Sequence, residues 1–430
     1  MAEEGDRRIR QLFESASQAF ASGRAQDAER LVRQAEAEAP RHPLVQNEIA
    51  RRMLLAGNAA GAHAVLEQAV KGDPSNPSLW LNLAAALRGL ERADEEMAAL
   101  EKVLAIEPRN LRARLQTASL QEIQGKQRAA AATYRTALQM IPPGAEAPPN
   151  MRPVLQHAKD AVDANDRALE AFLEERLKDL RARYADEPLG RFDRCLATLL
   201  QKRRIYRPQP TFMYFPYLPA IEFYERSDFP WLDAIEAATD DIRAELVTVL
   251  AEGQAALEPY ISLPEAMPLD QWRELNNSRR WGVYFLWREG VAIPEHIARC
   301  PRTVAALEAW PRCDVPGCGP TAVFSILDAK TRIPGHTGVT NTRLTVHLPL
   351  IIPPGCGFRV GAEVREWHPG KAFVFDDTIE HEAWNDSDVP RAVLILDIWS
   401  PFVSKAEREL VRSVTAGVGE YYGTGAYRGG

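Results

Sequence analysis

Residues 57–74, GNAAGAHAVLEQAVKGDP, set the period of the first third of the chain. The proline that ends this stretch recurs every 34 residues, at Pro40, Pro74, Pro108 and Pro142. The glycine that begins it recurs at Gly23 and Gly125, with Glu91 at the remaining step. A fixed period of this length indicates stacked helical repeats, because one unit cannot bury its apolar face alone. Residues 7–142 are therefore predicted to form an α-solenoid of about four units.

Small side chains fill further columns of the same lattice. The columns are Ala35, Ala69, Val103 and Ala137, then Ala25, Ala59 and Ala93, then Ala28, Ala62 and Ala130. Helices approach most closely where the side chains between them are small. The rest of this region is rich in Ala, Leu, Glu, Gln and Arg, which are good helix formers.

The period and the place of the proline resemble the tetratricopeptide repeat family over residues 7–142. The resemblance implies helix-turn-helix units, with the proline closing each second helix, stacked around a concave groove. We expect a peptide or protein substrate, or a partner protein, to bind in this groove. The alternative is a solenoid that serves only as a dimerisation or packing surface.

A proline-rich stretch at 141–153, IPPGAEAPPNMRP, ends the repeats. The charged segment that follows, 154–185, has apolar residues at helical spacing and is predicted to cap the solenoid. We assign 143–205 to this linker and capping helix, and 206–430 to a second domain.

Composition excludes several classes of protein. The 430 residues are 46% hydrophobic and 26% charged with a net charge of −7, which fits a globular chain of at least two domains and gives no reason to expect nucleic acid binding. No apolar run reaches the ~18 residues of a membrane span, and residues 1–10 lack a signal-peptide pattern, so we expect no membrane span and a cytoplasmic location. The five cysteines are predicted to be free thiols, because Cys313 and Cys318 alone make a weak zinc pattern.

The chain becomes rich in β-branched and aromatic residues after about residue 205. Short runs of this kind, separated by Gly, Pro or Asp, lie at 281–287, 322–327, 344–352, 357–360, 371–375 and 392–399. Such runs predict short strands of a sandwich or jelly roll. Helices are expected at 231–251 and 303–310. The fold class is thus multidomain α + β, with a helical solenoid followed by a strand-rich domain.

Half of the eight histidines lie close together in this second domain, at His336, His347, His368 and His381. Neutral imidazole is a favoured ligand of Fe(II), and a small double-sheet barrel can bring ligands from distant strands together. The alternative is that each histidine is an ordinary buried polar residue.

The sequence around these histidines resembles the aspartyl/asparaginyl β-hydroxylase family. The resemblance rests on His336-Thr337-Gly338 with Thr340, Asn341, Arg343 and His347, and on Phe375-Asp376-Asp377, His381-Glu382 and Trp384-Asn385. It covers about residues 208–402. It implies a double-stranded β-helix (a jelly-roll or cupin-like fold) and a dioxygenase that uses Fe(II), 2-oxoglutarate and O2.

The resemblance also implies roles for individual residues. His336 and His381 would be the iron ligands, and Arg391 would bind the distal carboxylate of 2-oxoglutarate, with Ser325 and His347 at further cosubstrate positions. The planar guanidinium of Arg391 suits bidentate binding of a carboxylate. The alternative for Arg391 is a surface salt bridge.

The sequence departs from the usual pattern of two histidines and one carboxylate. Gly338 stands where a carboxylate would follow the first histidine, and the family itself has a two-histidine iron site. Asp376 and Asp377 could replace that ligand, although a turn or an indirect role is favoured. Thr345 replaces a second arginine found in some relatives. Arg343 is a candidate for binding a substrate carboxylate, and Trp384 is a further candidate substrate residue; both have a packing alternative.

The leading hypothesis is hydroxylation of the β-carbon of Asp or Asn in a polypeptide that the repeats recruit. One alternative is hydroxylation of a free or carrier-bound amino acid or of a lipid acyl chain. An alternative from another class is a non-catalytic repeat scaffold whose β-domain only binds a ligand.

Overall fold

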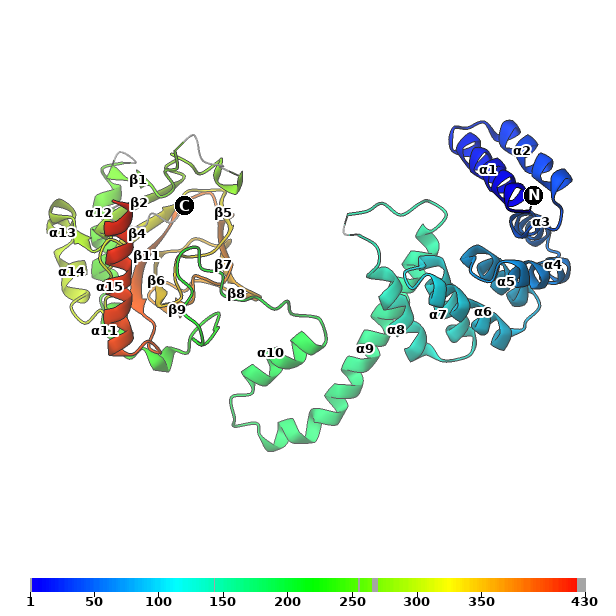
Figure 1. The fold of residues 1–430 in the computed structure, drawn as a ribbon. Helices are drawn as coiled ribbons and strands as arrows, with labels where there is room; N and C mark the ends of the chain where they lie inside the picture. Colours follow the sequence, from blue (N-terminus) through cyan, green and yellow to red (C-terminus); the bar gives the residue numbers. More distant parts are fainter. Residues whose placement is uncertain (1, 143, 254–255, 265–269, 424–430) are drawn as a thin grey trace. The chain divides into compact units, whose positions relative to one another are not determined.

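The computed structural model describes residues 2–142, 144–253, 256–264 and 270–423. The chain forms two compact units, Met1–Pro188 and Leu189–Gly430 (Figure 1). No helix in the described ranges is long and apolar enough to cross a membrane.

The first unit consists of helices joined by short turns, which confirms the predicted helical repeats (Figure 1). They are α1 (Ala2–Ala21), α2 (Ala25–Glu38), α3 (Pro43–Leu55), α4 (Ala59–Gly72), α5 (Pro77–Gly89), α6 (Ala93–Ile106), α7 (Leu111–Ile123), α8 (Gln127–Leu138) and α9 (Arg152–Arg183). Each repeat is a pair of helices, and each lattice proline follows the second helix of its pair.

The turns inside the helix pairs explain one column of the lattice. Gly23, Gly57 and Gly125 have φ angles of +72°, +78° and +73°, and Glu91 takes the same left-handed conformation with φ +60°. Glycine adopts this conformation without steric cost, whereas a residue with a Cβ pays for it. Glu91 therefore occupies a true repeat turn even though the sequence motif is broken there.

Two of the three small-residue columns form the interior of the solenoid, whereas Ala25 is exposed and Ala59 and Ala93 are half-buried. Ala35, Ala69, Val103 and Ala137 are all buried, as are Ala28, Ala62 and Ala130. The missing step of this second column is Glu96, which is also buried and is bound by the Arg88 guanidinium at 2.6 Å. Helix α9 packs on α8 through Ala158 and Val162, so its first half closes the apolar end of the repeats.

The second unit contains two antiparallel sheets with helices on the outside of the larger one (Figure 1). Its strands are β1 (Glu258–Pro259), β2 (Trp281–Arg288), β3 (Val291–Ala292), β4 (Ala322–Leu327), β5 (Thr331–His336), β6 (Arg343–Ile351), β7 (Cys356–Val360), β8 (Glu363–Arg365), β9 (Phe373–Phe375), β10 (His381–Asn385) and β11 (Arg391–Trp399). Its helices are α10 (Gly190–Leu199), α11 (Leu232–Ala237), α12 (Thr239–Leu250), α13 (Pro294–Arg299), α14 (Pro301–Ala306) and α15 (Lys405–Tyr422). The large sheet has the order β1-β2-β4-β11-β6-β9 with β3 paired to β2, and the small sheet has the order β5-β10-β7-β8.

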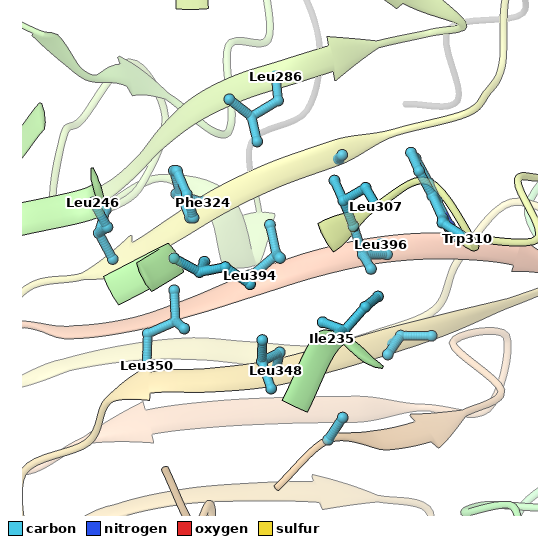
Figure 2. Packing of buried hydrophobic residues seen from close by; sticks show 14 of the residues in the cluster. Ile235, Leu246, Leu286, Leu307, Trp310, Phe324, Leu348, Leu350, Leu394 and Leu396 are labelled. Carbon is cyan, nitrogen blue, oxygen red and sulfur yellow. The ribbon is translucent and has the colours of Figure 1, made fainter. Parts of the chain in front are cut away.

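Alternation along the central strands gives the large sheet two different faces. Leu394 and Leu396 of β11 point outward with Leu348 of β6, where they pack against Ile235 of α11 and Leu246 of α12 (Figure 2). The intervening residues of the same strands point toward the other sheet. An apolar cluster that includes Phe358, Ile333 and Val393 fills the space between the two sheets.

The structure differs from the expected elements at several places. The helix expected at 231–251 is two helices, because the chain breaks at Ala238 and the Thr239 hydroxyl donates to the Glu236 carbonyl at 2.6 Å. The helix expected at 303–310 ends at Ala306. Strands β5 and β10 were not expected. Strand β5 ends at His336, and β10 begins at His381.

Candidate functional site

His336 and His381 lie opposite each other on neighbouring strands of the small sheet. They are cross-strand partners at the end of β5 and the start of β10, and their ring centroids are 4.1 Å apart. The Nδ1 of His336 lies 2.8 Å from the Pro334 carbonyl oxygen, and the Nδ1 of His381 lies 3.1 Å from that of Ile379. A carbonyl can only accept, so each Nδ1 carries the proton and each Nε2 keeps the lone pair that binds a metal.

Burial keeps both imidazoles neutral. It lowers the pKa of His336 to about 3, with the neighbouring His381 adding to the effect, and it lowers the pKa of His381 to about 4. A metal binds the neutral ring rather than the imidazolium. The pair therefore has the tautomer and the protonation state of a metal site across the neutral pH range.

No third protein ligand is at hand: within the described parts of the chain, no group of three or more His, Cys, Asp or Glu side chains could hold a metal. The Asp377 carboxylate fills the space that a side chain on Gly338 would take, and the Gly338 amide donates to the Asp377 carbonyl at 2.7 Å. The Asp377 Oδ1 atom is buried without a hydrogen-bond partner. Gly338 thus makes room for the carboxylate of Asp377.

Arg391 is a buried cation without a counter-ion. It is 1% exposed, its guanidinium lies 4.5 Å from the centroid of the Trp367 ring, and Nη1 donates to the Ser325 carbonyl at 3.3 Å. It forms no ion pair with any described residue, its Nε has no partner, and burial lowers its pKa to about 10. The alternative of a surface salt bridge is therefore wrong. A buried guanidinium left in this state is expected to take up an anion.

Other polar atoms around Arg391 also lack partners. His347 Nδ1 and Trp367 Nε1 are both buried and without hydrogen bonds, and the two rings lie 6.0 Å apart. Ser325 is buried beside them, where its hydroxyl accepts from Trp281 Nε1 at 3.1 Å. Buried polar groups are rarely left unsatisfied. These buried residues form a polar cluster around Arg391, and its donor chemistry suits an anionic ligand.

Arg343 already has two anionic partners. Its guanidinium lies 3.5 Å from Asp377 Oδ2 and 3.4 Å from Asp397 Oδ2. Burial disfavours the charged guanidinium, yet the two carboxylates outweigh burial and raise the pKa of Arg343 above its usual value. Burial also raises the pKa of Asp397 to about 6, with Arg343 opposing. Arg343 is thus held at the site, but its charge is neutralised by the protein.

Trp384 is not brought to the histidine pair. Along β10, His381, Ala383 and Asn385 share the inner face, so Trp384 points to the other side, where its ring lies over Gly357 and under the Arg332 guanidinium. This orientation favours the packing alternative for Trp384. His368 is exposed and lies outside the site as well.

Several residues at the site did not stand out in the sequence. Trp272 makes an edge contact with the His336 ring at 5.2 Å, and Tyr260 stacks on Trp281 at 4.0 Å, which gives the site an aromatic wall. Nothing in the local sequence distinguishes these rings from core aromatics. Asp397 could have been found, because it is the only acidic residue in the apolar strand RAVLILDIW.

Comparisons with known proteins find matches for both parts of the chain. Residues 236–401 match the family model of the aspartyl/asparaginyl β-hydroxylases, and residues 19–87 and 53–115 match that of the tetratricopeptide repeats.

Among curated proteins, the chain is 37% identical over 186 residues to an ornithine lipid ester-linked acyl 2-hydroxylase of Rhizobium tropici, covering 43% of this chain and 62% of the relative. It is 28% identical to the human aspartate β-hydroxylase domain-containing protein 2, covering 56% of this chain and 64% of that one. It is 33% identical to the human aspartyl/asparaginyl β-hydroxylase, over 38% of this chain and 21% of that protein.

The chain thus spans less than two thirds of the length of each of these relatives. The matched region contains both histidines, Arg391 and the strands that carry them. Residues 236–401 therefore match the model of the aspartyl/asparaginyl β-hydroxylase family, in a chain that also matches tetratricopeptide repeats.

Proposed function

We propose that the protein is a dioxygenase that uses Fe(II) and 2-oxoglutarate to hydroxylate a C–H bond, and that its two sheets form a double-stranded β-helix. The single observation that carries the proposal is Arg391, a buried cation with no anion, in the same space between the sheets as a neutral pair of histidines. Buried polar groups usually have partners, so the unsatisfied Arg391 Nε and His347 Nδ1 favour a bound ligand over a purely structural role.

The Nε2 atoms of His336 and His381 would hold Fe(II), and the polar cluster of Arg391, Ser325 and His347 would bind 2-oxoglutarate. Bound there, the metal supplies the activation of O2 that converts 2-oxoglutarate, O2 and a substrate R–H into succinate, CO2 and R–OH. The protein holds each imidazole through its Nδ1–H bond to a carbonyl and presents the Arg391 fork to a carboxylate. The wall of Trp272 and Trp281 limits access of water to His336.

Release of succinate tests the proposal against the non-catalytic alternative. The full chain with Fe(II), ascorbate, O2 and 2-oxoglutarate should form succinate slowly without any substrate, and formation should stop when a chelator is added. A protein that binds 2-oxoglutarate with Mn(II) in calorimetry and never forms succinate would be a ligand-binding scaffold instead.

The substrate expected from the sequence, Asp or Asn of a polypeptide, remains a prediction. The repeats support it, since a solenoid binds peptides, and so do the names of the human relatives. A protein that begins at Leu189, the start of the second compact unit, should keep its affinity for 2-oxoglutarate. Its apparent KM for a polypeptide substrate should rise at least tenfold, because a docking site is lost. An unchanged KM would make the repeats an assembly surface.

The second candidate substrate is a lipid acyl chain, and one observation favours it. Arg343 is paired with Asp377 and Asp397, and Thr345 stands where a second arginine would be, so neither position offers a free cation for a substrate carboxylate. The Rhizobium relative, 37% identical, is named for acyl hydroxylation. Comparing succinate formation with an Asp-containing peptide and with an acylated amino acid separates the two candidates.

A further inference from the structure

Trp367 has an indole N–H group that lacks a hydrogen-bond partner inside the protein. In the described ranges, its Nε1 is the one indole nitrogen that is buried without a partner, and the residue is 3% exposed. Two other buried indoles are paired. Trp281 donates to the Ser325 hydroxyl at 3.1 Å, and Trp310 donates to the Asp397 carbonyl at 2.9 Å. Because buried donors in proteins are nearly always paired, the N–H of Trp367 indicates an acceptor from outside the chain.

The ring of Trp367 lies against the guanidinium of Arg391. The central carbon of the guanidinium is 4.5 Å from the centroid of the indole ring, over its face. The indole cannot bind Arg391 through its N–H, because both groups are donors only. Two neighbouring donors that cannot pair with each other can both bind one anion.

His347 adds a third unpaired group to this cluster. Its ring lies 6.0 Å from that of Trp367 at an interplanar angle of 29°, and its Nδ1 is buried without a partner. Arg391 begins β11, His347 lies in β6 and Trp367 lies in the loop between β8 and β9. Strand β6 pairs with β11, and the Gly370 amide of that loop donates to the Pro349 carbonyl of β6 at 2.9 Å. The sheet therefore holds the three unpaired groups together.

The charge of this cluster matches one carboxylate. Burial lowers the pKa of His347, so its ring is neutral and adds no charge. The indole is neutral at every pH of interest, which leaves the single positive charge of Arg391. A ligand with one carboxylate at this place neutralises the cation and also offers oxygen acceptors to the neighbouring N–H.

We propose that Trp367 is a cosubstrate-binding residue, whose indole N–H donates to the same distal carboxylate that Arg391 binds. The assignment rests on the proposed function and deepens it. A site built to pair a carboxylate rejects an analogue that lacks it, because its buried donors then stay unpaired. Trp367 and Arg391 together therefore select 2-oxo dicarboxylates over 2-oxo monocarboxylates.

Calorimetry on the full chain with Mn(II) tests this selection. Trp367→Phe keeps an aromatic ring beside Arg391 and removes the N–H. It should weaken 2-oxoglutarate at least about tenfold, the usual loss for a hydrogen bond to a charged group. 2-Oxopentanoate, which lacks the distal carboxylate, should bind weakly and equally to the parent and to Trp367→Phe. An unchanged preference for 2-oxoglutarate over 2-oxopentanoate in Trp367→Phe would overturn the assignment.

Two control variants separate the lost donor from altered packing. Phe358 stacks beside Trp367 with ring centroids 5.3 Å apart, and its side chain has no polar atom. Phe358→Leu should therefore change the affinity for 2-oxoglutarate by less than about threefold, because every donor is kept. Trp384→Phe removes an indole that lies over Gly357, away from the cluster, and should bind 2-oxoglutarate as the parent does. A loss in Phe358→Leu as large as that in Trp367→Phe would show that packing, not the N–H, is responsible.

Nuclear magnetic resonance of the indole N–H groups gives a readout that does not depend on turnover. The chain has nine tryptophans, and the signal of Trp367 is assigned by its loss in Trp367→Phe. With Zn(II) as a diamagnetic metal, 2-oxoglutarate should move this proton signal to higher frequency, as a new hydrogen bond to a carboxylate does. 2-Oxopentanoate should leave the signal in place. A Trp367 signal that does not move when the parent is saturated with 2-oxoglutarate contradicts the assignment.

This inference and the proposed function fail in different ways. If the parent and Trp367→Phe bind 2-oxoglutarate equally, only the role of Trp367 is wrong. If the parent does not bind 2-oxoglutarate at all, the cosubstrate of the proposed function is wrong and the role of Trp367 is wrong with it.

Discussion

The carboxylate of Asp377 occupies the place where a side chain on Gly338 would lie. Gly338→Asp, which restores a carboxylate two residues after His336, should therefore collide with Asp377 instead of completing a ligand set. Gly338→Ala should already destabilise the fold by about 1–3 kcal/mol, the usual cost of overpacking. Urea unfolding measures the change.

Gly417→Ala serves as the control for this substitution, because nothing lies within 4 Å of the added Cβ and the position is helical. It should be neutral or stabilising by up to about 1 kcal/mol. Gly338→Ala combined with Asp377→Ala should recover most of the lost stability. An unchanged free energy of unfolding for Gly338→Ala alone would contradict the close approach of Gly338 and Asp377.

The histidine pair should be needed for the metal but not for the fold. His336→Ala and His381→Ala should each lower the affinity for Mn(II), a stand-in for Fe(II), at least a hundredfold in calorimetry, since the proposed site takes its protein ligands from these two imidazoles alone. The unfolding temperature of each variant should lie no more than a few degrees below that of the metal-free parent. His368→Ala, which changes an exposed histidine outside the site, should bind Mn(II) normally.

Arg391 should dominate the affinity for the cosubstrate. Arg391→Ala should weaken 2-oxoglutarate binding by about 30- to several-thousand-fold, since losing one partner of a buried charged pair costs about 2–5 kcal/mol. Ser325→Ala should cost about 1 kcal/mol, as one neutral hydrogen bond does. Arg332→Ala is the control, because that guanidinium is largely exposed on β5. Equal affinity of the parent and Arg391→Ala in calorimetry with Mn(II) would place the cosubstrate elsewhere.

Asp376 should make the fold less stable as the pH rises. Burial raises its pKa to about 7, with the Thr378 hydroxyl and amide opposing by hydrogen bonds at 2.6 and 2.9 Å. The folded state therefore binds an extra proton between about pH 4 and 7, and the free energy of unfolding falls across that range. Asp376→Asn mimics the protonated side chain. Its free energy of unfolding, relative to that of the parent, should therefore rise by about 1–3 kcal/mol between pH 5 and pH 8.

Thermal and urea unfolding at the two pH values measure this effect. Asp388→Asn is the matched control, because its carboxylate is 90% exposed and should show no such growth. An advantage of Asp376→Asn that is the same at both pH values would contradict the raised pKa.

The ion pair of Arg88 and Glu96 stands at one step of the column formed by Ala28, Ala62 and Ala130, and losing one of its partners should destabilise the repeats. Arg88→Ala should destabilise the first unit by about 1–3 kcal/mol, because it leaves the buried Glu96 carboxylate without its cation. Arg88→Ala with Glu96→Ala should regain most of the loss, since Ala28, Ala62 and Ala130 already fill this column in the other repeats. Circular dichroism during urea unfolding reports the change. A double variant no better than Arg88→Ala would show that the pair does more than neutralise charge.

The repeats were predictable because their signal is periodic. The 34-residue lattice located every repeat turn, including the one at Glu91, where the residue type gave no help. The strands β4, β6 and β11 were predictable because residues on both of their faces are buried. Each strand is therefore a nearly continuous apolar run in the sequence.

The histidine strands were not predictable from composition. TRIPGH contains Pro334 and Gly335, and HEAWN is largely polar, so neither has a high intrinsic preference for strand. They are strands because they pair with each other and β10 also pairs with β7. The orientation of Trp384 was not predictable for the same reason. Without the strand, the opposite orientation of its side chain from that of His381 could not be deduced.

The position of β11 in the large sheet has a consequence for synthesis of the protein. Helix pairs of the first unit contact their neighbours in sequence, so each pair can form soon after it leaves the ribosome. Strand β11 lies between β4 and β6, and it is the last strand in the described part of the chain. The two halves of that sheet therefore have to wait, with apolar faces uncovered, until residues 391–399 emerge. We expect the nascent second unit to be the stage at which this protein most needs a chaperone.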